Sequence, residues 1–336
     1  MAGTLVKDIT TKKEDYADSL ALVDARKYPF TSAVKKSGKA TDVRFDWTAD
    51  SYRSAPVFAG VVDGADVTDF KDEFSNRGKL SNYIQIFREA PKVSTLTQVA
   101  TNMPGAANPI AAATAKGLVE LKRGMEAAFL SSQDAQVETG SVGYLTCGLG
   151  LFISTGGPTV ATVPSGQRPA SGQVITTATA TLDEDTDMQG ILKEIFDAVG
   201  MVSENYMLLC GSVLRRRVTS MTRIASTAGS TNSANRVRTF TQTAKEQSIV
   251  NTTVMFEGDF GSFSVVPSSW IGMTTGSATV DTDRGYLLDM DMLSLRYNQR
   301  PTVMPLPDLG GGPRRLIDAI AGLEVQSPKG MGKFQP

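Results

Sequence analysis

The longest helical pattern in the chain covers residues 110–131. Apolar residues recur there at intervals of three and four, which places them on one face of a helix. Lys122 and Glu126 fall away from that face, four residues apart, so they are expected to form an exposed ion pair. Gly117 and Gly124 interrupt the helix, and they indicate either close packing of the helix on a sheet or a helix that bends between conformers.

Two segments with the two-residue period of half-buried strands flank a polar stretch. Phe45 and Trp47 alternate with charged residues, and a second such run covers residues 81–89. The sequence between them, residues 51–72, is rich in Gly, Asp and Ser. The pattern predicts a long two-strand excursion over residues 42–89. Two strands alone are marginally stable in water, so we expect them to lean on another surface.

The second half of the chain mixes short helices and strands. An acidic cluster at 183–187 precedes apolar residues at helical spacing that end at Gly200, and the acids suit the start of a helix better than a metal site. Strands are predicted over 206–210, 287–297 and 314–326, a helix over 212–221, and a hairpin from 249–256 and 262–267. No β-α-β rhythm joins these elements, which indicates the α+β fold class.

Two segments show no clean period. Residues 1–41 mix charges of both signs and cannot form a core alone, so we expect either an N-terminal arm that lies on another surface or a mobile tail. Residues 155–181 are rich in Gly, Pro, Thr and Ser, which predicts a loop or a small inserted β excursion on the outer surface.

The absence of histidine from all 336 residues changes the functional picture most. Histidine is the commonest general base and metal ligand, so serine and cysteine triads that depend on it are excluded. Cys147 and Cys210 form no CxxC motif and lie in apolar runs, which indicates reduced, buried thiols. No apolar run is long enough for a bilayer span and no signal-peptide core begins the chain, so we expect a soluble, cytoplasm-made protein with no membrane partner.

Sequence motifs for catalysis and ligand binding are missing as well. There is no GxxxxGK[ST] loop and no GxSxG elbow, and residues 281–285 resemble a calcium loop only in part, because the glycine comes one position early. Asp289 and Asp291 form a DxD pattern in a predicted strand, where a solvated or interface-facing edge is favoured over a metal. We therefore expect no catalytic, cofactor-binding or metal-binding residues, and no enzyme.

One stretch departs from the overall balance of 34 basic and 35 acidic residues. Residues 211–245 carry seven basic residues and no acidic one, a local charge of +7. Such a stretch suits phosphate or acidic neighbours, or it forms a solvated helix face with a loop. Its candidate interface or DNA-facing residues are Arg215, Arg216, Arg217, Arg223, Arg236 and Arg238.

Five segments of the chain form a recognisable series: Ser75–Arg77 with Asn82–Glu89, Gly117–Leu130 and Gly322–Gly330, supported by Thr146–Leu149 and Gly258–Gly261. Taken in order, they resemble a branch of tailed-bacteriophage major capsid proteins, formerly catalogued as a domain of unknown function, which has the Hong Kong 97 fold. These are packing motifs rather than catalytic signatures. Their order along residues 42–330 carries the resemblance.

The resemblance implies the parts of that fold. They are an N-terminal arm (1–41), an extended two-strand loop (42–89), a peripheral domain (90–181) with a spine helix (110–131), an axial domain (182–285), and a return to the peripheral domain (286–336). Gly117 and Gly124 within the spine helix and the stretch 155–181 depart from the family pattern, and the glycines mark a place where the helix is expected to flex.

The resemblance also implies a function. It is that of a structural major capsid protein that self-assembles into pentamers and hexamers of an icosahedral phage head enclosing double-stranded DNA. The expected partners are copies of the chain, with scaffolding, portal and decoration proteins, and the expected location is the virion. The basic stretch would then face the packaged DNA or acids on neighbouring subunits, for which the candidates are Asp281, Asp283, Asp289 and Asp291.

Three other functions remain open at this point. An encapsulin-like nanocompartment shell has the same fold and encloses protein cargo, so shells that lack nucleic acid would favour it. An enzyme with carboxylate chemistry would need a supported carboxylate pair, and none is visible in the sequence. A stand-alone nucleic-acid-binding module would show strongly salt-dependent DNA binding as free subunits.

Overall fold

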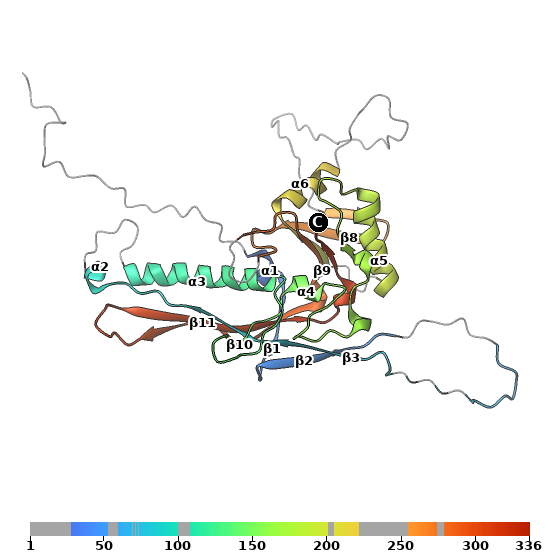
Figure 1. Cartoon of the computed structure of the whole chain (residues 1–336), viewed down its shortest axis with the longest axis horizontal. Coiled ribbons are helices and arrows are strands. Elements are labelled where there is room, and N and C mark those ends of the chain that lie inside the picture. Colours follow the sequence, from blue (N-terminus) through green and yellow to red (C-terminus); the bar gives the residue numbers. More distant parts are fainter. Residues whose placement is uncertain are drawn as a thin grey trace, which may run out of the picture. The chain divides into compact units, whose positions relative to one another are not determined.

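The computed structural model describes residues 28–52, 60–68, 70, 72, 74–99, 108–200, 205–221, 255–273 and 279–336 (Figure 1). These residues form three sheets and several helices. A four-stranded sheet has the order β1-β10-β11-β4, a six-stranded sheet the order β5-β12-β9-β6-β8-β7, and a two-stranded ribbon pairs β2 with β3. The α+β class is confirmed. The bounds of the sheet strands are β1 Lys35–Lys39, β2 Arg44–Ala49, β3 Gly78–Tyr83, β4 Gln85–Glu89, β5 Val174–Ile175, β6 Tyr206–Cys210, β7 Met255–Gly258, β8 Gly261–Pro267, β9 Gly285–Asp289, β10 Leu293–Leu306, β11 Arg314–Val325 and β12 Gly332–Phe334.

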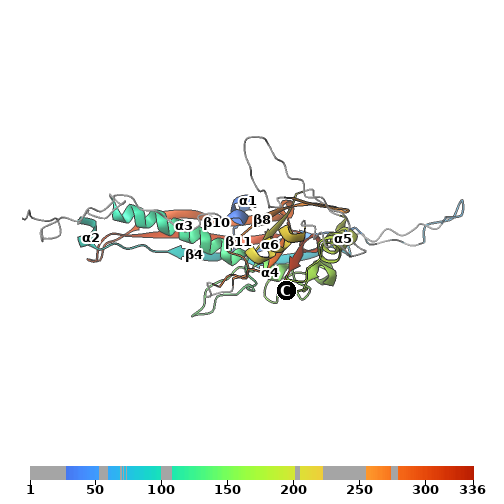
Figure 2. The ribbon, with the colours of Figure 1, turned by 90° about the horizontal axis from the view of Figure 1, so that it is seen from above.

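The predicted long helix is α3 (Pro109–Phe129), which Figure 2 shows from above. Asn108 caps its first turn, because the side-chain oxygen of Asn108 accepts the N–H of Ala111 at 3.4 Å. At its other end Phe129 is fully buried and meets Phe87 edge to face, with ring centroids 5.8 Å apart.

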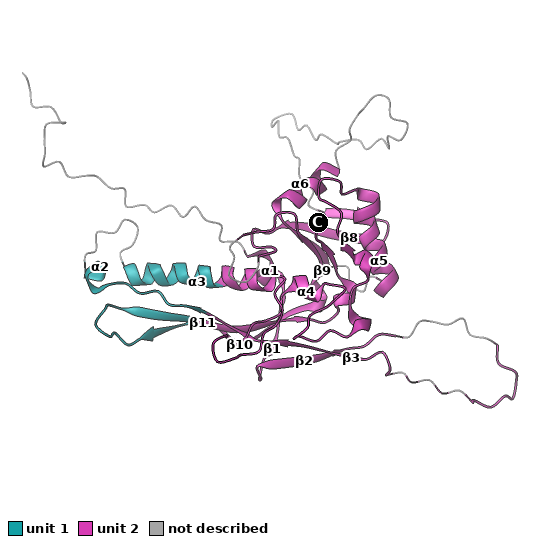
Figure 3. Ribbon diagram, viewed as in Figure 1, with its two compact units in different colours: residues 1–27, 88–121, 302–317 teal, residues 28–87, 122–301, 318–336 magenta. Residues whose placement is uncertain are grey.

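The chain divides into two compact units (Figure 3). The described part of unit 1 falls within residues 88–121 and 302–317, and that of unit 2 within residues 28–87, 122–301 and 318–336. The elements α3, β10 and β11 each contribute residues to both units.

The six-stranded sheet of unit 2 is built around β6, whose five residues are all buried. The strand pairs in parallel with β8 and antiparallel with β9, and the helices α5 (Gln189–Val199) and α6 (Ser212–Met221) supply apolar residues to the same core. The predicted strand 206–210 and helix 212–221 are confirmed. The hairpin is confirmed over 255–267, and residues 249–254 lie outside the described residues.

The acidic cluster at 183–187 leads into α5 through one turn of π-helix, η4 (Glu184–Met188). The carboxylate of Asp187 accepts the N–H of Asp183 at 2.7 Å and the hydroxyl of Thr177 at 2.9 Å. Helix α5 ends at Gly200, whose φ of 75° lies in the left-handed region that glycine adopts without strain. The acids therefore lie at the start of the helical segment, as predicted, although neither Asp183 nor Met188 caps it with a side-chain hydrogen bond.

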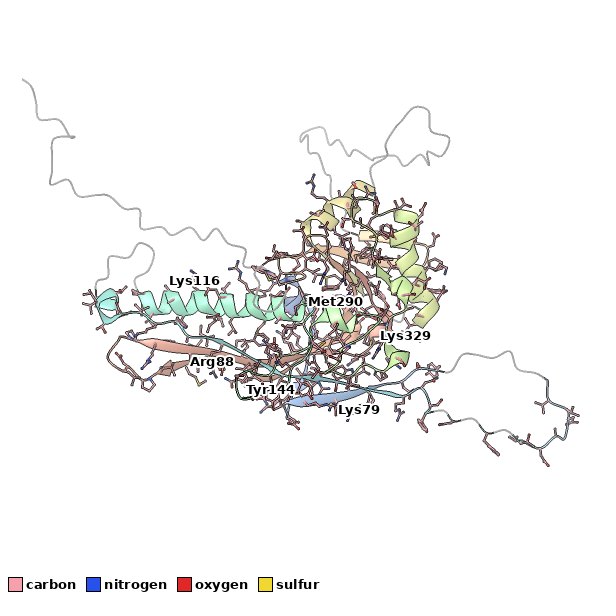
Figure 4. All side chains as sticks on the ribbon, in the orientation of Figure 1. Lys79, Arg88, Lys116, Tyr144, Met290 and Lys329 are labelled. Atoms are coloured by element: carbon pink, nitrogen blue, oxygen red, sulfur yellow. The ribbon has the colours of Figure 1, made fainter. Side chains whose placement is uncertain are left out.

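The β2–β3 ribbon rests on the body of unit 2 through its aromatic face. Phe45 and Trp47 are buried and stack at a centroid distance of 5.7 Å, and the indole N–H of Trp47 donates to the carbonyl of Val325 at 3.0 Å. The opposite face carries an exposed ion pair between Asp46 and Lys79, the latter labelled in Figure 4. The predicted alternation is therefore confirmed, and the surface that supports the ribbon belongs to the same chain.

Asn82 joins three segments that lie far apart in the sequence. Its side chain is fully buried, and its amide donates to the carbonyl of Leu323 at 2.7 Å and to the hydroxyl of Thr146 at 3.1 Å. Its carbonyl oxygen accepts the N–H of Cys147 at 2.9 Å. Three of the segments that carry the family resemblance, at 82–89, 146–149 and 322–330, thus meet at one side chain.

The stretch 155–181 belongs to unit 2 and consists of loops, 3₁₀ turns and one short strand, which fits the predicted loop or small β excursion; its place on an outer surface stays a prediction. Its strand β5 pairs with β12 of the six-stranded sheet, and Ala161 and Val163 are buried. Gln173 is fully buried and donates to the carbonyl of Lys329 at 2.7 Å. Isolated apolar residues and polar side chains hold this stretch, so no hydrophobic period revealed it in the sequence.

Asp134 holds the beginning of the stretch 155–181 in place through hydrogen bonds. One carboxylate oxygen accepts the N–H groups of Thr159 at 2.8 Å and Val160 at 3.2 Å. Burial pushes the pKa of Asp134 upward, but the hydrogen bonds from Thr159, Val160 and Ala135 outweigh it and leave the pKa lowered.

We expect Asp134→Asn to lower the free energy of unfolding by about 1 kcal/mol, because the amide presents a donor where two N–H groups point. A carboxyl group with a lowered folded-state pKa stabilises the fold above its ordinary pKa of 3.8, and this stabilisation is lost as the pH falls through the folded-state value. Denaturation midpoints at several pH values should therefore show a difference between the two proteins at neutral pH that shrinks below 3.8. A constant difference would contradict this role of the charge.

The two glycines of α3 have different surroundings. A Cβ atom on Gly117 would lie 2.9 Å from the Cδ1 atom of Ile317, whereas one on Gly124 would meet nothing within 4 Å. Close packing against β11 therefore accounts for Gly117, within unit 1. No neighbouring atom requires a glycine at position 124.

This contrast gives a matched pair of variants. Gly124→Ala is expected to raise the free energy of unfolding by about 1 kcal/mol, since alanine is the better helix former. Gly117→Ala gains the same propensity but must displace Ile317, so its thermal midpoint should lie below that of Gly124→Ala. Equal midpoints would contradict the packing argument.

Candidate assembly surfaces

Residues 28–40, the described end of the predicted N-terminal arm and here called the arm base, are held on unit 2. Helix α1 (Pro29–Ala33) buries Phe30 completely. The two carboxylate oxygens of Glu126, on α3, accept the N–H groups of Phe30 and Thr31, each at 2.7 Å. Burial raises the pKa of Glu126, and the two backbone donors oppose this rise.

Two further contacts hold the same segment. The strand β1 pairs in parallel with β10, and Lys35 forms an exposed ion pair with Asp291 at 2.7 Å. The ammonium of Lys122 lies 5.5 Å from the ring centroid of Tyr28. The sequence prediction that Lys122 and Glu126 form an exposed pair was wrong, because each of them contacts the arm base instead.

The loop between β2 and β3 presents apolar side chains to solvent. Arg77 closes the base of the loop through an ion pair with Asp50 at 3.0 Å, and its guanidinium lies 4.8 Å from the ring centroid of Phe74. Monomeric proteins rarely keep many apolar side chains exposed together, so this loop has the character of a contact surface. Its exposed apolar residues among those described are Tyr52, Val61, Val62, Val67, Phe70 and Phe74.

A second set of exposed apolar residues lies in unit 1. Leu96 and Val99 on α2 (Thr95–Val99) are exposed, and so is Leu309 in the turn between β10 and β11. Asp308 organises that turn by accepting the N–H groups of residues 310, 311 and 312. The turn therefore holds a defined backbone conformation next to Leu309.

Three of the six candidate arginines of the basic stretch lie within the described residues, and they have different roles. On α6, Arg215 donates to the carbonyl of Val265 at 2.7 Å and Arg217 donates to the carbonyl of Leu182 at 3.0 Å. Arg216 lies between them and is exposed. Two of the three arginines thus hold α6 to its own subunit. Arg223, Arg236 and Arg238 lie outside the described residues.

The structure brings part of the acidic set to these arginines. A cavity of about 850 Å³ is lined by Arg215, Arg216 and Arg217 together with Asp281 and Asp283. Asp281 also forms an ion pair with Arg284 at 3.1 Å. Arginines and acids that were expected to meet between subunits therefore share one cavity within unit 2.

Asp289 and Asp291 lie elsewhere, at the junction of β9 and β10. Asp289 is only 2% exposed, and its carboxylate accepts the N–H of Asp291 at 3.0 Å to start the short 3₁₀ turn η5 (Met290–Met292). This turn interrupts the predicted strand, so the expectation of a solvated DxD edge was wrong for Asp289. A carboxylate that is buried in its own subunit is not available to a neighbour, and Asp289 leaves the set of candidate counterparts.

Within the described ranges, no group of three or more Cys, Asp or Glu side chains is arranged to hold a metal ion. Burial raises the pKa of Cys210 to about 12 and the pKa of Cys147 well above its usual value, so both thiols are protonated at neutral pH. Both cysteines are free and buried, as predicted. No helix in the part of the chain that the structure describes has the length and apolar character of a membrane span.

Several solved structures from phages share this fold. The chain matches one from Mycobacterium phage Bobi at a TM-score of 0.60 and 12% identity, covering 100% of this chain and 99% of that one. It matches one from Microbacterium phage Oxtober96 at 0.60 and 12%, covering 100% of both chains, and one from Mycobacterium phage Adephagia at 0.58 and 13%, covering 100% and 98%. No curated protein sequence matches the chain significantly.

The fold is therefore that of the phage major capsid proteins, of the Hong Kong 97 type. The family model for the SU10 major capsid protein matches residues 3–336, and the chain belongs to this family. Its role is that of a structural capsid protein in a multimeric shell of the virion, which favours the phage capsid over the encapsulin-like alternative. Membership in a structural family also implies that the protein is not an enzyme.

Glu126 and Asn82 are the functional side chains whose roles were not predicted. Both lie in segments that carry the family resemblance, but a single sequence does not show which residue of a segment makes the contacts. The two backbone donors that Glu126 receives lie 96 and 95 residues away in the chain. A buried glutamate within a charged helix face leaves no periodic signal.

Proposed function

We propose that the protein self-assembles into the pentamers and hexamers of an icosahedral head that encloses double-stranded DNA. The observation that carries this proposal is the loop between β2 and β3, whose six exposed apolar side chains project from a ribbon that is itself well packed. Burial of apolar area against copies of the chain would stabilise the assembly at about 25 cal/mol per Å².

Each part of the fold named from the resemblance would have its own role in assembly. The arm (1–41) and the extended loop (42–89) would clasp adjacent subunits, and the axial domain (182–285) would meet its copies around the five-fold and six-fold centres. The peripheral domain (90–181 with 286–336) would form the connections between capsomers. The exposed residues of unit 1, Leu96, Val99 and Leu309, support that last assignment.

Many weak contacts suit such a shell better than a few strong ones. A contact of roughly −4 kcal/mol corresponds to a dissociation constant of about 1 mM, so a misplaced subunit leaves readily. Several such contacts per subunit, closed by symmetry, still give a persistent particle.

The basic stretch would act at the interior or at the capsomer centre. Arg216, with Arg223, Arg236 and Arg238, is proposed to face packaged DNA or the acids of a neighbouring subunit, for which Asp281, Asp283 and Asp291 remain candidates. Arg215 and Arg217 contribute mainly by fixing α6, since their guanidinium groups already bind carbonyl oxygens of their own subunit. Gly124 is proposed as the position where α3 flexes, because no packing requirement explains it.

Scaffolding, portal and decoration proteins are the further partners expected for such a head, and synthesis would take place in the bacterial host cytoplasm. The experiment that tests the proposal is electron microscopy of the full-length protein, expressed alone and with the genes next to its own. Rings with five-fold and six-fold symmetry, or closed shells, are expected. Filaments or unassembled subunits under every condition would refute it.

A further inference from the structure

The N-terminal arm begins from a segment that is anchored to the subunit at one polar point. Glu126 is fully buried, and both of its carboxylate oxygens accept backbone N–H groups, from Phe30 and Thr31. Charge-assisted hydrogen bonds of this kind are about twice as strong as neutral ones. Burial of a carboxylate is costly without such partners, so the anchor depends on residues 30 and 31 remaining in place.

The contacts around this anchor fix where the chain lies at residue 28 and the direction of its backbone there. Phe30 is fully buried beside the carboxylate, the ammonium of Lys122 lies on the ring of Tyr28, and β1 continues in parallel pairing along β10. These contacts hold the residues before and after α1 in place. The position and direction of the backbone at residue 28 are therefore set by these contacts.

We propose that Glu126 is the positioning residue that sets where the N-terminal arm leaves the subunit, and hence which neighbouring copy the arm reaches. This rests on the proposed assembly function. Glu126 acts through the backbone of residues 30 and 31 and does not itself touch the neighbour. Its loss releases the arm base while the core of unit 2 remains folded.

The variant Glu126→Gln tests this, because glutamine keeps one carbonyl acceptor and turns an amide donor toward the second N–H. Phe30→Ala tests the same anchor from the arm side and leaves α3 unchanged. Glu120→Gln is the matched control, since Glu120 lies on the same helix and forms an exposed pair with Lys116 at 3.7 Å.

The measurement is amide hydrogen exchange of the full-length protein, read by mass spectrometry. In Glu126→Gln and in Phe30→Ala, exchange in residues 28–40 is expected to rise about tenfold or more, which is the loss of one charged hydrogen bond. Exchange in β6 and β9 should stay unchanged, and Glu120→Gln should match the wild type throughout. Unchanged exchange in 28–40, or an equal rise in β6 and β9, would overturn the anchoring role.

Electron microscopy of the same variants reads the consequence for assembly. Fewer closed shells and more irregular particles are expected for Glu126→Gln than for Glu120→Gln. Selective release of residues 28–40 with normal shells would overturn the positioning role and leave the assembly function intact. If the wild-type protein itself forms no shells, the assembly function fails, and the exchange data still decide whether Glu126 anchors the arm.

Discussion

Replacing Asn82 with alanine is expected to lower the free energy of unfolding by about 4 kcal/mol or more, the largest effect of any single substitution considered. The change leaves the carbonyl of Leu323 and the N–H of Cys147 buried without their partner, and each such group costs about 1 to 3 kcal/mol. Typical domains are stable by about 5 to 15 kcal/mol, so the variant should give little soluble protein and a sharply lowered thermal midpoint.

Asn76→Ala is the matched control for this experiment. Asn76 lies in the neighbouring loop and is exposed, so its replacement should change stability by less than about 0.5 kcal/mol. A thermal midpoint for Asn82→Ala within the range of the Asn76→Ala control would show that the junction of the three segments does not depend on this side chain.

The second large effect is expected in the extended loop. Changing Val61, Val62 and Val67 to threonine and Phe70 to serine keeps the loop length and removes most of its exposed apolar surface. Each large apolar side chain contributes about 1.5 to 3 kcal/mol when it is buried, which exceeds a weak subunit contact in total. Closed shells should be lost, while circular dichroism and the thermal midpoint of the subunit remain unchanged because these side chains contact no core.

The control for the loop variant carries Ala65→Ser and Thr68→Ser in the same described segment and retains the apolar side chains. It should assemble as the wild type does, as judged by light scattering and electron microscopy. Normal shells from the apolar-depleted loop would contradict the proposal that this loop makes an essential subunit contact.

The elements with strong periodicity could be predicted from the sequence alone. Helix α3, strand β6, helix α6 and the alternation of Phe45 and Trp47 follow directly from the spacing of apolar residues. The end of α5 at Gly200 follows from the conformational freedom of glycine. In these elements the local conformational preference of the residues agrees with the tertiary packing, so the pattern of apolar residues is enough to predict them.

Polar side chains with long-range partners could not be predicted. The stretch 155–181 depends on Asp134 and Gln173, which bind backbone groups far away in the sequence. Arg215 and Arg217 were expected to face neighbours or DNA, yet both cap carbonyl groups of their own subunit. The chemistry of such a residue can be read from the sequence, but its partner is set only by the fold.

The central claim is that this protein is a subunit whose exposed loop, arm and unit 1 surfaces are covered by copies of itself. Sedimentation velocity of the purified full-length protein tests it most directly. The account predicts species many times heavier than the 35.8 kDa chain, up to closed shells. A single species of 35.8 kDa at every concentration and ionic strength, with or without the proteins encoded beside it, would contradict the account.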